Sequence, residues 1–407
     1  VMALLKMKYK WLVLTLLWVS FFGVHFHRVA YSPLIPTIMQ ELDISYASAG
    51  LLMSAYFLAY AIAQIPTGVL VDRFGARKVV SLFMIIFAGG AILFTKVTNF
   101  EMGFISRFLI GFGSGVIWVS GIKIISYWFK RSERGFTTGV FSASANFGAT
   151  VALLAIPLVV IVHGWRQGYF LTTIPVIILI GLNWLLIRDY PSDIGLPSPE
   201  DPKSIEPEAK YATSQKTLVH NVLKDPHAWP LCLSTFFYLG GWYGTLTWVP
   251  TYCFEELKIP LVTSGLIGSL ITLGAAISPI TGILADKIGR KPVYVVGMAS
   301  YALFTFLFIT FSSYYNIIPT AILAILMGIA FSSFAFSFTM ISELFPPKVT
   351  ATASGVLNAC AFLGALVYPA VMGIILDLSK SYYIAFLTVV IGEVVGMAIA
   401  LKIKETK

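Results

Sequence analysis

Three basic side chains lie close together inside the first long apolar segment: His25, His27 and Arg28. An arginine in hydrocarbon costs roughly 2.5–3.5 kcal/mol on insertion scales, so it usually faces a protein interior or a water-filled cavity. Its guanidinium stays charged and can bind carboxylate or phosphate oxygens in a bidentate manner. His25, Tyr31 and Ser32 are three or four residues from Arg28 and share its helix face. We predict that Arg28 anchors a small anion; the alternative is that it snorkels to the membrane edge or pairs internally.

The two histidines are candidate proton carriers, because an unperturbed histidine has a pKa of about 6.5. His25 shares the face of Arg28, whereas His27 is displaced by about 100° around the helix. The alternative for each is a neutral, hydrogen-bonded histidine that faces another helix.

Further polar and aromatic side chains extend this candidate site along other apolar segments. Tyr56, Tyr60 and Gln64 recur every four residues and form one stripe. Asn146 and Asn358 occupy related positions in the two halves, although such residues often serve as helix–helix hydrogen bonds. Aromatic rings could stack on the apolar body of a substrate, or could belong to an interfacial belt. The predicted substrate contacts are Arg28, His25, Tyr31, Ser32, Tyr56, Tyr60, Gln64, Ser114, Trp118, Asn146, Trp242, Tyr243 and Asn358.

The composition identifies the solvent that surrounds these segments. The 407 residues are 57% hydrophobic and only 12% charged, with a mean hydropathy of +0.84. Soluble domains are nearer 45–50% apolar and about 25% charged. The chain therefore belongs in a lipid bilayer. Its first apolar segment, about 11–39, is too long for a signal-peptide core, and we expect it to be a retained span.

Twelve apolar segments are long enough to span a bilayer, each with about 20 mostly apolar residues. A polar stretch rich in Pro, Ser and charge separates the sixth from the seventh. We therefore predict a six-helix bundle over 1–190, a linker over 191–228 and a second bundle over 229–407. The segments are roughly 11–39, 47–71, 79–97, 102–128, 136–162, 166–187, 229–253, 261–285, 292–311, 316–343, 350–376 and 381–402.

The two halves carry a common motif. "GVLVDRFGARK" at 68–78 recurs as "GILADKIGRKP" at 282–292, so that Asp72 and Gly75 match Asp286 and Gly289 at an offset of 214. Two related halves are typical of transporters, whose site lies at the interface between them.

The basic residues predict the orientation. Of 28 Lys and Arg residues, two, Arg28 and Lys123, fall within spans, and 21 lie on the side of both termini. The other side has five, which are Lys96, Arg107, Arg166, Lys258 and Lys380. The positive-inside rule places that side in the cytoplasm. The net charge of +9 is therefore explained by topology and does not indicate nucleic-acid binding.

The repeated motif resembles the loop signature of the major facilitator superfamily, G-x-L-x-D-R-x-G-R-[RK], and "RFLIGFGSG" at 107–115 resembles its fourth-helix pattern. The resemblance implies an all-α membrane protein of twelve transmembrane helices in two pseudo-symmetric bundles, usually monomeric, that works by alternating access. It also implies a cytoplasmic gate, formed here by Asp72, Arg73, Arg77, Asp286 and Arg290. We expect Asp72 to lie at the N-terminal side of a turn, where the helix dipole favours a carboxylate.

Within the superfamily, "HRVAYSPLIPTI", "YFLAYAIAQIPTG" and "TLTWVPTY" resemble the anion:cation symporters. This branch implies a monocarboxylate or sugar-acid substrate and coupling to protons or sodium. His27 and Ser114 stand where members of the branch often carry acidic residues, which weakens a carboxylate-based proton mechanism and makes His25 or His27 the coupling candidates.

Two other functions are weighed against this one. A drug or metabolite exporter of the same superfamily would carry a G-x-x-x-G-P-x-x-G-G pattern in its fifth helix, which is missing here. A membrane sensor would be expected to carry an enlarged cytoplasmic loop or tail. No nucleophile motif, nucleotide loop or metal-ligand spacing is written in the chain, so we predict neither an enzyme nor a cofactor or metal.

Overall fold

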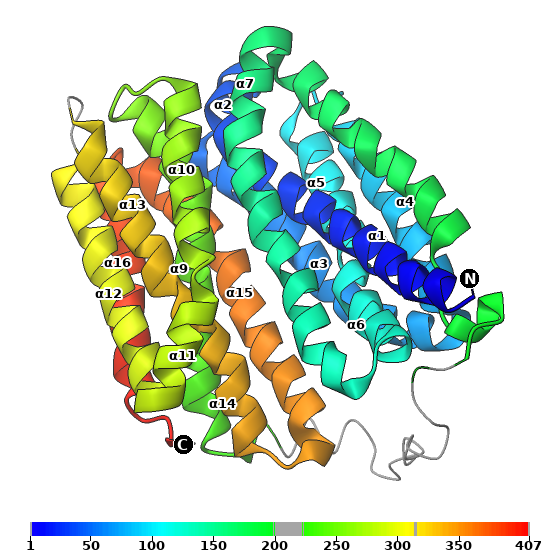
Figure 1. The fold of residues 1–407 in the computed structure, drawn as a ribbon. Coiled ribbons are helices and arrows are strands. Elements are labelled where there is room, and N and C mark those ends of the chain that lie inside the picture. Colours follow the sequence, from blue (N-terminus) through cyan, green and yellow to red (C-terminus); the bar gives the residue numbers. More distant parts are fainter. Residues whose placement is uncertain (1, 198, 200–221, 223, 313–315, 406–407) are drawn as a thin grey trace. The chain divides into compact units, whose positions relative to one another are not determined.

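The computed structural model describes residues 2–197, 199, 222, 224–312 and 316–405, and every regular element in these ranges is a helix (Figure 1). Most of the linker predicted at 191–228 lies outside the described residues. The helices of the N-terminal half are α1 (Met2–Ala30), η1 (Ser32–Leu34), α2 (Ile35–Leu42), α3 (Tyr46–Phe74), α4 (Ala76–Phe94), α5 (Phe100–Ser114), α6 (Val116–Trp128) and α7 (Arg131–Leu186), followed by η2 (Pro191–Ile194). Those of the C-terminal half are α9 (Ala228–Glu255), α10 (Leu261–Ala275), α11 (Ser278–Ile288), α12 (Arg290–Phe311), α13 (Ile317–Phe331), η3 (Ser332–Ala335), α14 (Phe336–Leu344), α15 (Pro347–Ser379) and α16 (Tyr382–Ala400).

Each of the twelve predicted apolar segments is helical, which confirms the all-α membrane class. In the described part of the chain, nine helical stretches are long and apolar enough to cross a membrane, and α10 with α11, bent by 43°, would be a tenth. The difference from twelve has two causes. Helix α7 covers two predicted segments and turns at Gly164 (φ 73°, ψ 161°). Helix α9 falls outside the nine because its Gly, Thr, Tyr and Trp residues lower its hydropathy.

The first span is broken where the sequence removes a backbone hydrogen-bond donor. Pro33 has no N–H, so the hydrogen-bond ladder of α1 cannot continue through it, and the chain passes through η1 before α2 begins. The break leaves Arg28 in the last turn of α1. A basic side chain is favoured there by the helix dipole.

The internal repeat is visible in the backbone. Gly75 ends α3 with φ 85° and ψ 152°, and its repeat partner Gly289 ends α11 with φ 102° and ψ 155°. This combination of angles is accessible essentially to glycine alone. The matched motifs therefore make the same sharp turn between consecutive helices in both halves.

The helices form two compact units. The first comprises Val1–Arg28, Leu58–Ala152 and Val159–Tyr211, and the second comprises Val29–Phe57, Leu153–Leu158 and Ala212–Lys407. Two segments of the N-terminal half thus pack with the C-terminal half. The boundaries predicted above follow the sequence halves and stay a prediction.

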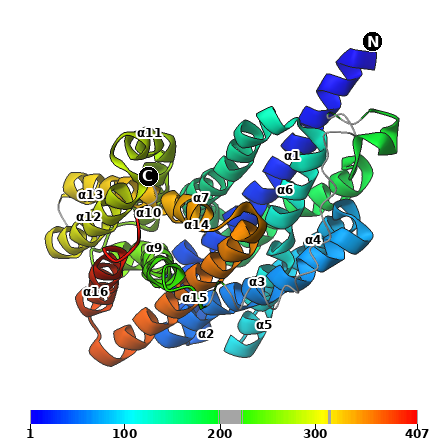
Figure 2. The same cartoon turned by 90° about the horizontal axis from the view of Figure 1, so that it is seen from below.

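Inside the second unit, α9 packs against α15 and α16, and α12 packs against α13 and α16 (Figures 1 and 2). Glycines let α3 and α15 approach closely. A Cβ on Gly50 would collide with the Pro369 carbonyl oxygen, and one on Gly373 would collide with that of Tyr46. Small residues at such crossings are a common basis of helix association in membranes.

Candidate functional site

Arg28 is buried at the end of α1, with 2% of its surface exposed. Its guanidinium carbon lies 4.8 Å from the centre of the Tyr60 ring on α3. A cation over an aromatic face gains about 0.5–2 kcal/mol, more when water is excluded. Two predicted site residues are therefore in contact, and the ring orients the charge.

Arg107 on α5 is completely buried beside the same helix end. Its guanidinium donates to the carbonyl oxygens of His27 and Arg28, at 3.4 and 3.5 Å. These carbonyls belong to the last turn of α1, where the helix has unsatisfied acceptors. The charge count above assigns Arg107 to the outer side of the membrane, which stays a prediction; its burial and its two carbonyl partners are what the structure adds. The motif "RFLIGFGSG", which begins with Arg107, is the sequence feature that could have indicated a buried role for this residue.

The two histidines are held by backbone carbonyls. His25 Nδ1 lies 3.1 Å from the Phe21 oxygen, and His27 Nε2 lies 3.2 Å from the Thr172 oxygen. A ring nitrogen that faces a carbonyl must carry the hydrogen and donate it. His27 also packs edge-on against Phe87 and Tyr169. Both side chains are thus hydrogen-bonded, His27 to α7 and His25 to the preceding turn of α1 itself.

The remaining predicted contacts of the first unit are grouped less tightly. Trp118 and His25 both pack on the ring of Phe21, at centroid distances of 5.6 and 4.3 Å. The Ser114 hydroxyl donates to the Gly111 carbonyl of its own helix at 2.7 Å. Gln64 and Asn146 are half-buried.

In the second unit, an aromatic cluster joins α3 to α9. The ring of Phe57 lies 4.5 Å from Tyr243 and 6.1 Å from Phe362. Trp242 stacks on Phe331 at 3.9 Å. Tyr31 donates to the Ala49 carbonyl at 2.9 Å. Of the other predicted contacts in this unit, Ser32 and Tyr56 are buried and Asn358 is half-buried.

The predicted gate residue Asp72 lies at the N-terminal side of the turn, as predicted. That position is the C-terminal end of α3, where the helix dipole does not favour a carboxylate, so the predicted dipole argument is wrong. The carboxylate is stabilised instead by Lys123 on α6, whose Nζ lies 2.6 Å from Asp72 Oδ1. The same contact gives a partner to Lys123, the second cation that the sequence places within a span.

The other predicted gate residues also have local partners. Arg77 donates from Nε to the Trp184 carbonyl at 2.6 Å, and Arg73 stacks on Phe74. In the second half, Arg290 bridges two acids. It lies 3.1 Å from Asp286 and 3.2 Å from Glu343.

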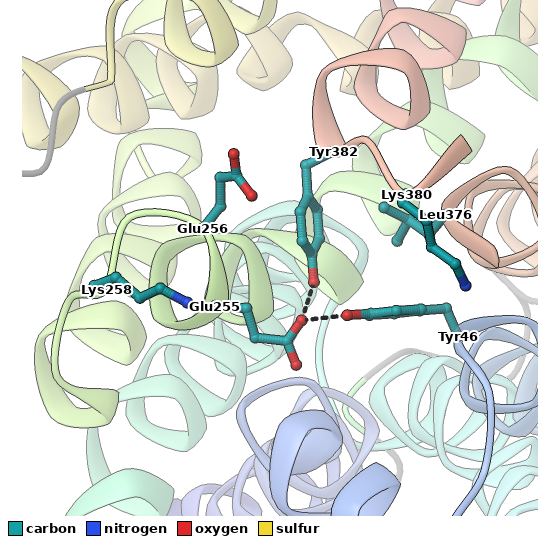
Figure 3. Close-up of a pocket in the computed structure, with 7 residues that line it drawn as sticks. All are labelled: Tyr46, Glu255, Glu256, Lys258, Leu376, Lys380 and Tyr382. Atoms are coloured by element: carbon teal, nitrogen blue, oxygen red, sulfur yellow. Dashed lines mark hydrogen bonds between the residues drawn. The ribbon is translucent and has the colours of Figure 1, made fainter. Parts of the chain in front are cut away.

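A polar cluster joins four helix ends in the second unit, and it was not among the sites predicted from the sequence. Tyr46 and Tyr382 donate to the same oxygen of Glu255, at 2.6 and 2.7 Å, and their hydroxyls converge on it in Figure 3. Asp377 accepts from the backbone N–H groups of Tyr46 and Ala47, at 3.1 and 2.8 Å. These residues come from α3, α9, α15 and α16, so no local sequence pattern links them.

A cavity of about 360 Å³ opens at this cluster. Its lining consists of Tyr46, Glu255 and Tyr382 together with Glu256, Lys258, Leu376 and Lys380 (Figure 3). The cavity is distinct from the surroundings of Arg28, which belong to the other compact unit.

Comparisons with known proteins agree with this architecture. The sequence pattern of the Major Facilitator Superfamily matches residues 17–280 and 269–407. A probable sulfoacetate transporter of Cupriavidus necator is 24% identical over 417 residues, covering 96% of this chain and 93% of that protein. A probable L-galactonate transporter of Escherichia coli is 26% identical over 373 residues, covering 86% and 80%.

Solved structures share the fold. A bacterial homologue of the human lysosomal transporter Spinster, in an inward-facing and unoccupied conformation, superposes with a TM-score of 0.81 at 16% identity, over 96% of each chain. The match of the family pattern to most of the chain decides the classification. The chain belongs to the Major Facilitator Superfamily and is a membrane transporter, not an enzyme.

Proposed function

We propose that this protein is a secondary active transporter of small organic anions and that Arg28 is the anion anchor. The observation that carries the proposal is the burial of a permanently charged guanidinium at the end of α1, against the Tyr60 ring. Burying a cation of this kind costs free energy, and a charged residue within a span is therefore a functional-site hypothesis by default. The planar guanidinium would bind an incoming carboxylate in a bidentate manner.

The relatives support the substrate class. They include probable transporters of sulfoacetate, of L-galactonate and of galactarate or D-glucarate, all of them small organic acids. Trp242 and Tyr243 are uncharged aromatic residues on α9 and would contact the carbon skeleton of such an acid. We therefore propose a monocarboxylate or sugar acid as substrate, in the manner of the anion:cation symporters.

The proposed cycle is alternating access in the cell membrane, carried out by a monomer with both termini and the linker in the cytoplasm. Asp72, Arg73, Arg77, Asp286 and Arg290 would form the cytoplasmic gate, whose ion pairs break and re-form during the cycle. Entry of the anion would be coupled to protons or sodium, with His25 or His27 as predicted proton carriers.

A thermal-shift experiment on the purified protein tests the proposal. Monocarboxylates, sugar acids, dicarboxylates, sugar phosphates, inorganic anions and cationic drugs are compared at pH 5.5 and 7.5. A ligand at one hundred times its Kd adds about 2.7 kcal/mol to the folded state, which is a readily measured shift. We expect organic acids to stabilise the wild type and Arg28→Ala to lose that response.

Lys96→Ala is the matched control, because Lys96 is an exposed cation that belongs to neither the proposed anion site nor the proposed gate. It should respond to organic acids like the wild type. Stabilisation by cationic drugs alone, or a normal response of Arg28→Ala, would contradict the anion-anchor role and favour an exporter.

A further inference from the structure

Glu393 is an acidic residue buried in the middle of α16. It lies 11 residues after Tyr382, which begins this 19-residue helix, or about 16 Å along the helix axis. None of its surface is exposed. Among the described residues, neither carboxyl oxygen has a hydrogen-bond partner. An acid at this depth is costly to keep and marks a functional site by default.

Helix α16 is packed against α9, α12 and α15, and none of the three supplies Glu393 with a cation among the described residues. On α9, the backbone of Gly241 lies directly against the carboxyl, since a Cβ there would collide with Glu393 Oε1. Glycine at position 241 therefore makes the room that the acid occupies.

In the described part of the chain, the titratable groups within electrostatic range of Glu393 are four tyrosines. They are Tyr238 on α9, Tyr294 and Tyr301 on α12, and Tyr368 on α15. At least two of these hydroxyls are engaged elsewhere. Tyr238 donates to the Ala330 carbonyl at 2.6 Å, and Tyr294 lies 3.3 Å from the hydroxyls of both Ser234 and Thr235. Tyrosine hydroxyls are neutral at physiological pH, so this environment offers no compensating charge.

An ionised carboxylate without water, counter-ion or hydrogen bond is far more costly than the neutral acid. The packing around Glu393 therefore favours the protonated form. A conformation that lets water reach α16 would stabilise the carboxylate and release the proton. Occupancy of the site by a proton and conformation of the helix bundle are thus thermodynamically linked.

We propose that Glu393 is the proton-binding site of the C-terminal half: it holds a proton in this conformation and releases it when the bundle around α16 opens to water. The proposal rests on the proposed transport function and assigns proton coupling to Glu393 in place of His25 and His27. It accounts for an intramembrane acid that neither the anion site nor the gate uses.

The first test requires no substrate. Thermal unfolding of the purified protein is measured from pH 5.5 to 8.5, together with the infrared carbonyl stretch of neutral carboxylic acids. The folded state binds a proton that the unfolded chain releases, so the melting temperature of the wild type should fall as the pH rises. Glu393→Gln mimics the neutral acid. Its melting temperature should lose this dependence on pH, and its infrared spectrum should lack one carbonyl band of a neutral carboxylic acid. Glu256→Gln, an exposed neighbour of the polar cluster, should keep both. Glu393→Met, an apolar replacement of similar length, repeats the measurement if the glutamine variant does not fold.

The second test uses proteoliposomes with a radiolabelled aldonate as probe. In response to an imposed pH gradient, the wild type should accumulate the aldonate, whereas Glu393→Gln should only exchange it across the membrane. Glu256→Gln, the exposed control of the first test, should still accumulate it. The proposal is overturned if the melting temperature of Glu393→Gln depends on pH as that of the wild type does. It is also overturned if Glu393→Gln still accumulates the aldonate. If the wild type carries no aldonate, the proposed function fails for that substrate class, and the substrate-free measurement alone decides whether Glu393 binds a proton.

Discussion

Asp377 on α15 caps the first turn of α3. Its two carboxylate oxygens accept the backbone N–H groups of Tyr46 and Ala47, at 3.1 and 2.8 Å. A carboxylate at a helix N-terminus satisfies donors that the helix itself cannot and interacts favourably with the helix dipole. Two helices separated by some 330 residues in the sequence are joined by this contact.

Asp377→Ala should lower the free energy of unfolding by about 0.5–2 kcal/mol, the usual effect of losing a helix cap. Asp377→Asn keeps one acceptor and should lose less. The measurement is thermal or denaturant unfolding in detergent. Equal stability of the alanine variant and the wild type would contradict the capping role.

The neighbouring pair Glu255 and Glu256 allows a matched comparison. Glu255 accepts two tyrosine hydroxyls, whereas Glu256 is exposed. Hydrogen bonds to charged groups contribute about 1.5–3 kcal/mol. Glu255→Ala should therefore destabilise the protein clearly, and Glu256→Ala should change its stability by less than about 0.5 kcal/mol. Similar melting temperatures for the two variants would argue against the cluster.

The repeated turn predicts a paired glycine result. Gly75→Ala and Gly289→Ala place a Cβ on a backbone conformation that costs about 1–3 kcal/mol for other residues, and at Gly75 the Cβ also meets the Asp189 carboxylate. Gly68 and Gly282 are the matched controls in the same motifs. A Cβ there meets no atom within 4 Å, and alanine favours the helix. Their alanine variants should be as stable as the wild type or more so, as measured by thermal unfolding.

The ion pair between Asp72 and Lys123 should contribute little to stability, because the Asp72 side chain is 77% exposed. A double-mutant cycle with Asp72→Ala and Lys123→Ala should give a coupling energy of at most about 1 kcal/mol. If the pair belongs to a gate, each single variant should alter the transport rate more than the melting temperature. If both variants transport at the rate of the wild type, the pair is not part of a gate, and its charges only help to set the membrane topology.

The contact between Arg28 and Tyr60 predicts a graded effect on ligand affinity. Tyr60→Phe keeps the aromatic face and should bind organic acids nearly as well as the wild type. Tyr60→Leu removes an interaction of about 0.5–2 kcal/mol, equivalent to a roughly two- to thirtyfold change in Kd. Isothermal titration of the two variants with one organic acid checks this. Equal affinities would show that the ring does not orient the guanidinium.

Much of the fold could be predicted from the sequence because its causes are local. Apolar length decides which segments enter the membrane, and a repeated glycine decides where two of them turn, as Gly75 and Gly289 demonstrate. Arg28 could be singled out because a charge in an apolar segment is conspicuous without any knowledge of its neighbours.

The partners of the polar side chains could not be predicted in the same way. Lys123 could be read as a guide for anions or as a snorkelling residue, but the structure pairs it with Asp72 across two helices. Arg107, read as an outer-side residue, is buried at the end of α1.

The sequence by itself thus determined the solvent, the helices, the internal repeat and the most conspicuous charge, since each follows from composition or short-range spacing. Only the tertiary structure decided that Asp377 caps α3, that two tyrosines share Glu255 and that Glu393 is buried without a hydrogen bond in the described structure. Those relationships depend on which helix faces come together, and a helix face is chosen by packing between segments that are far apart in the chain.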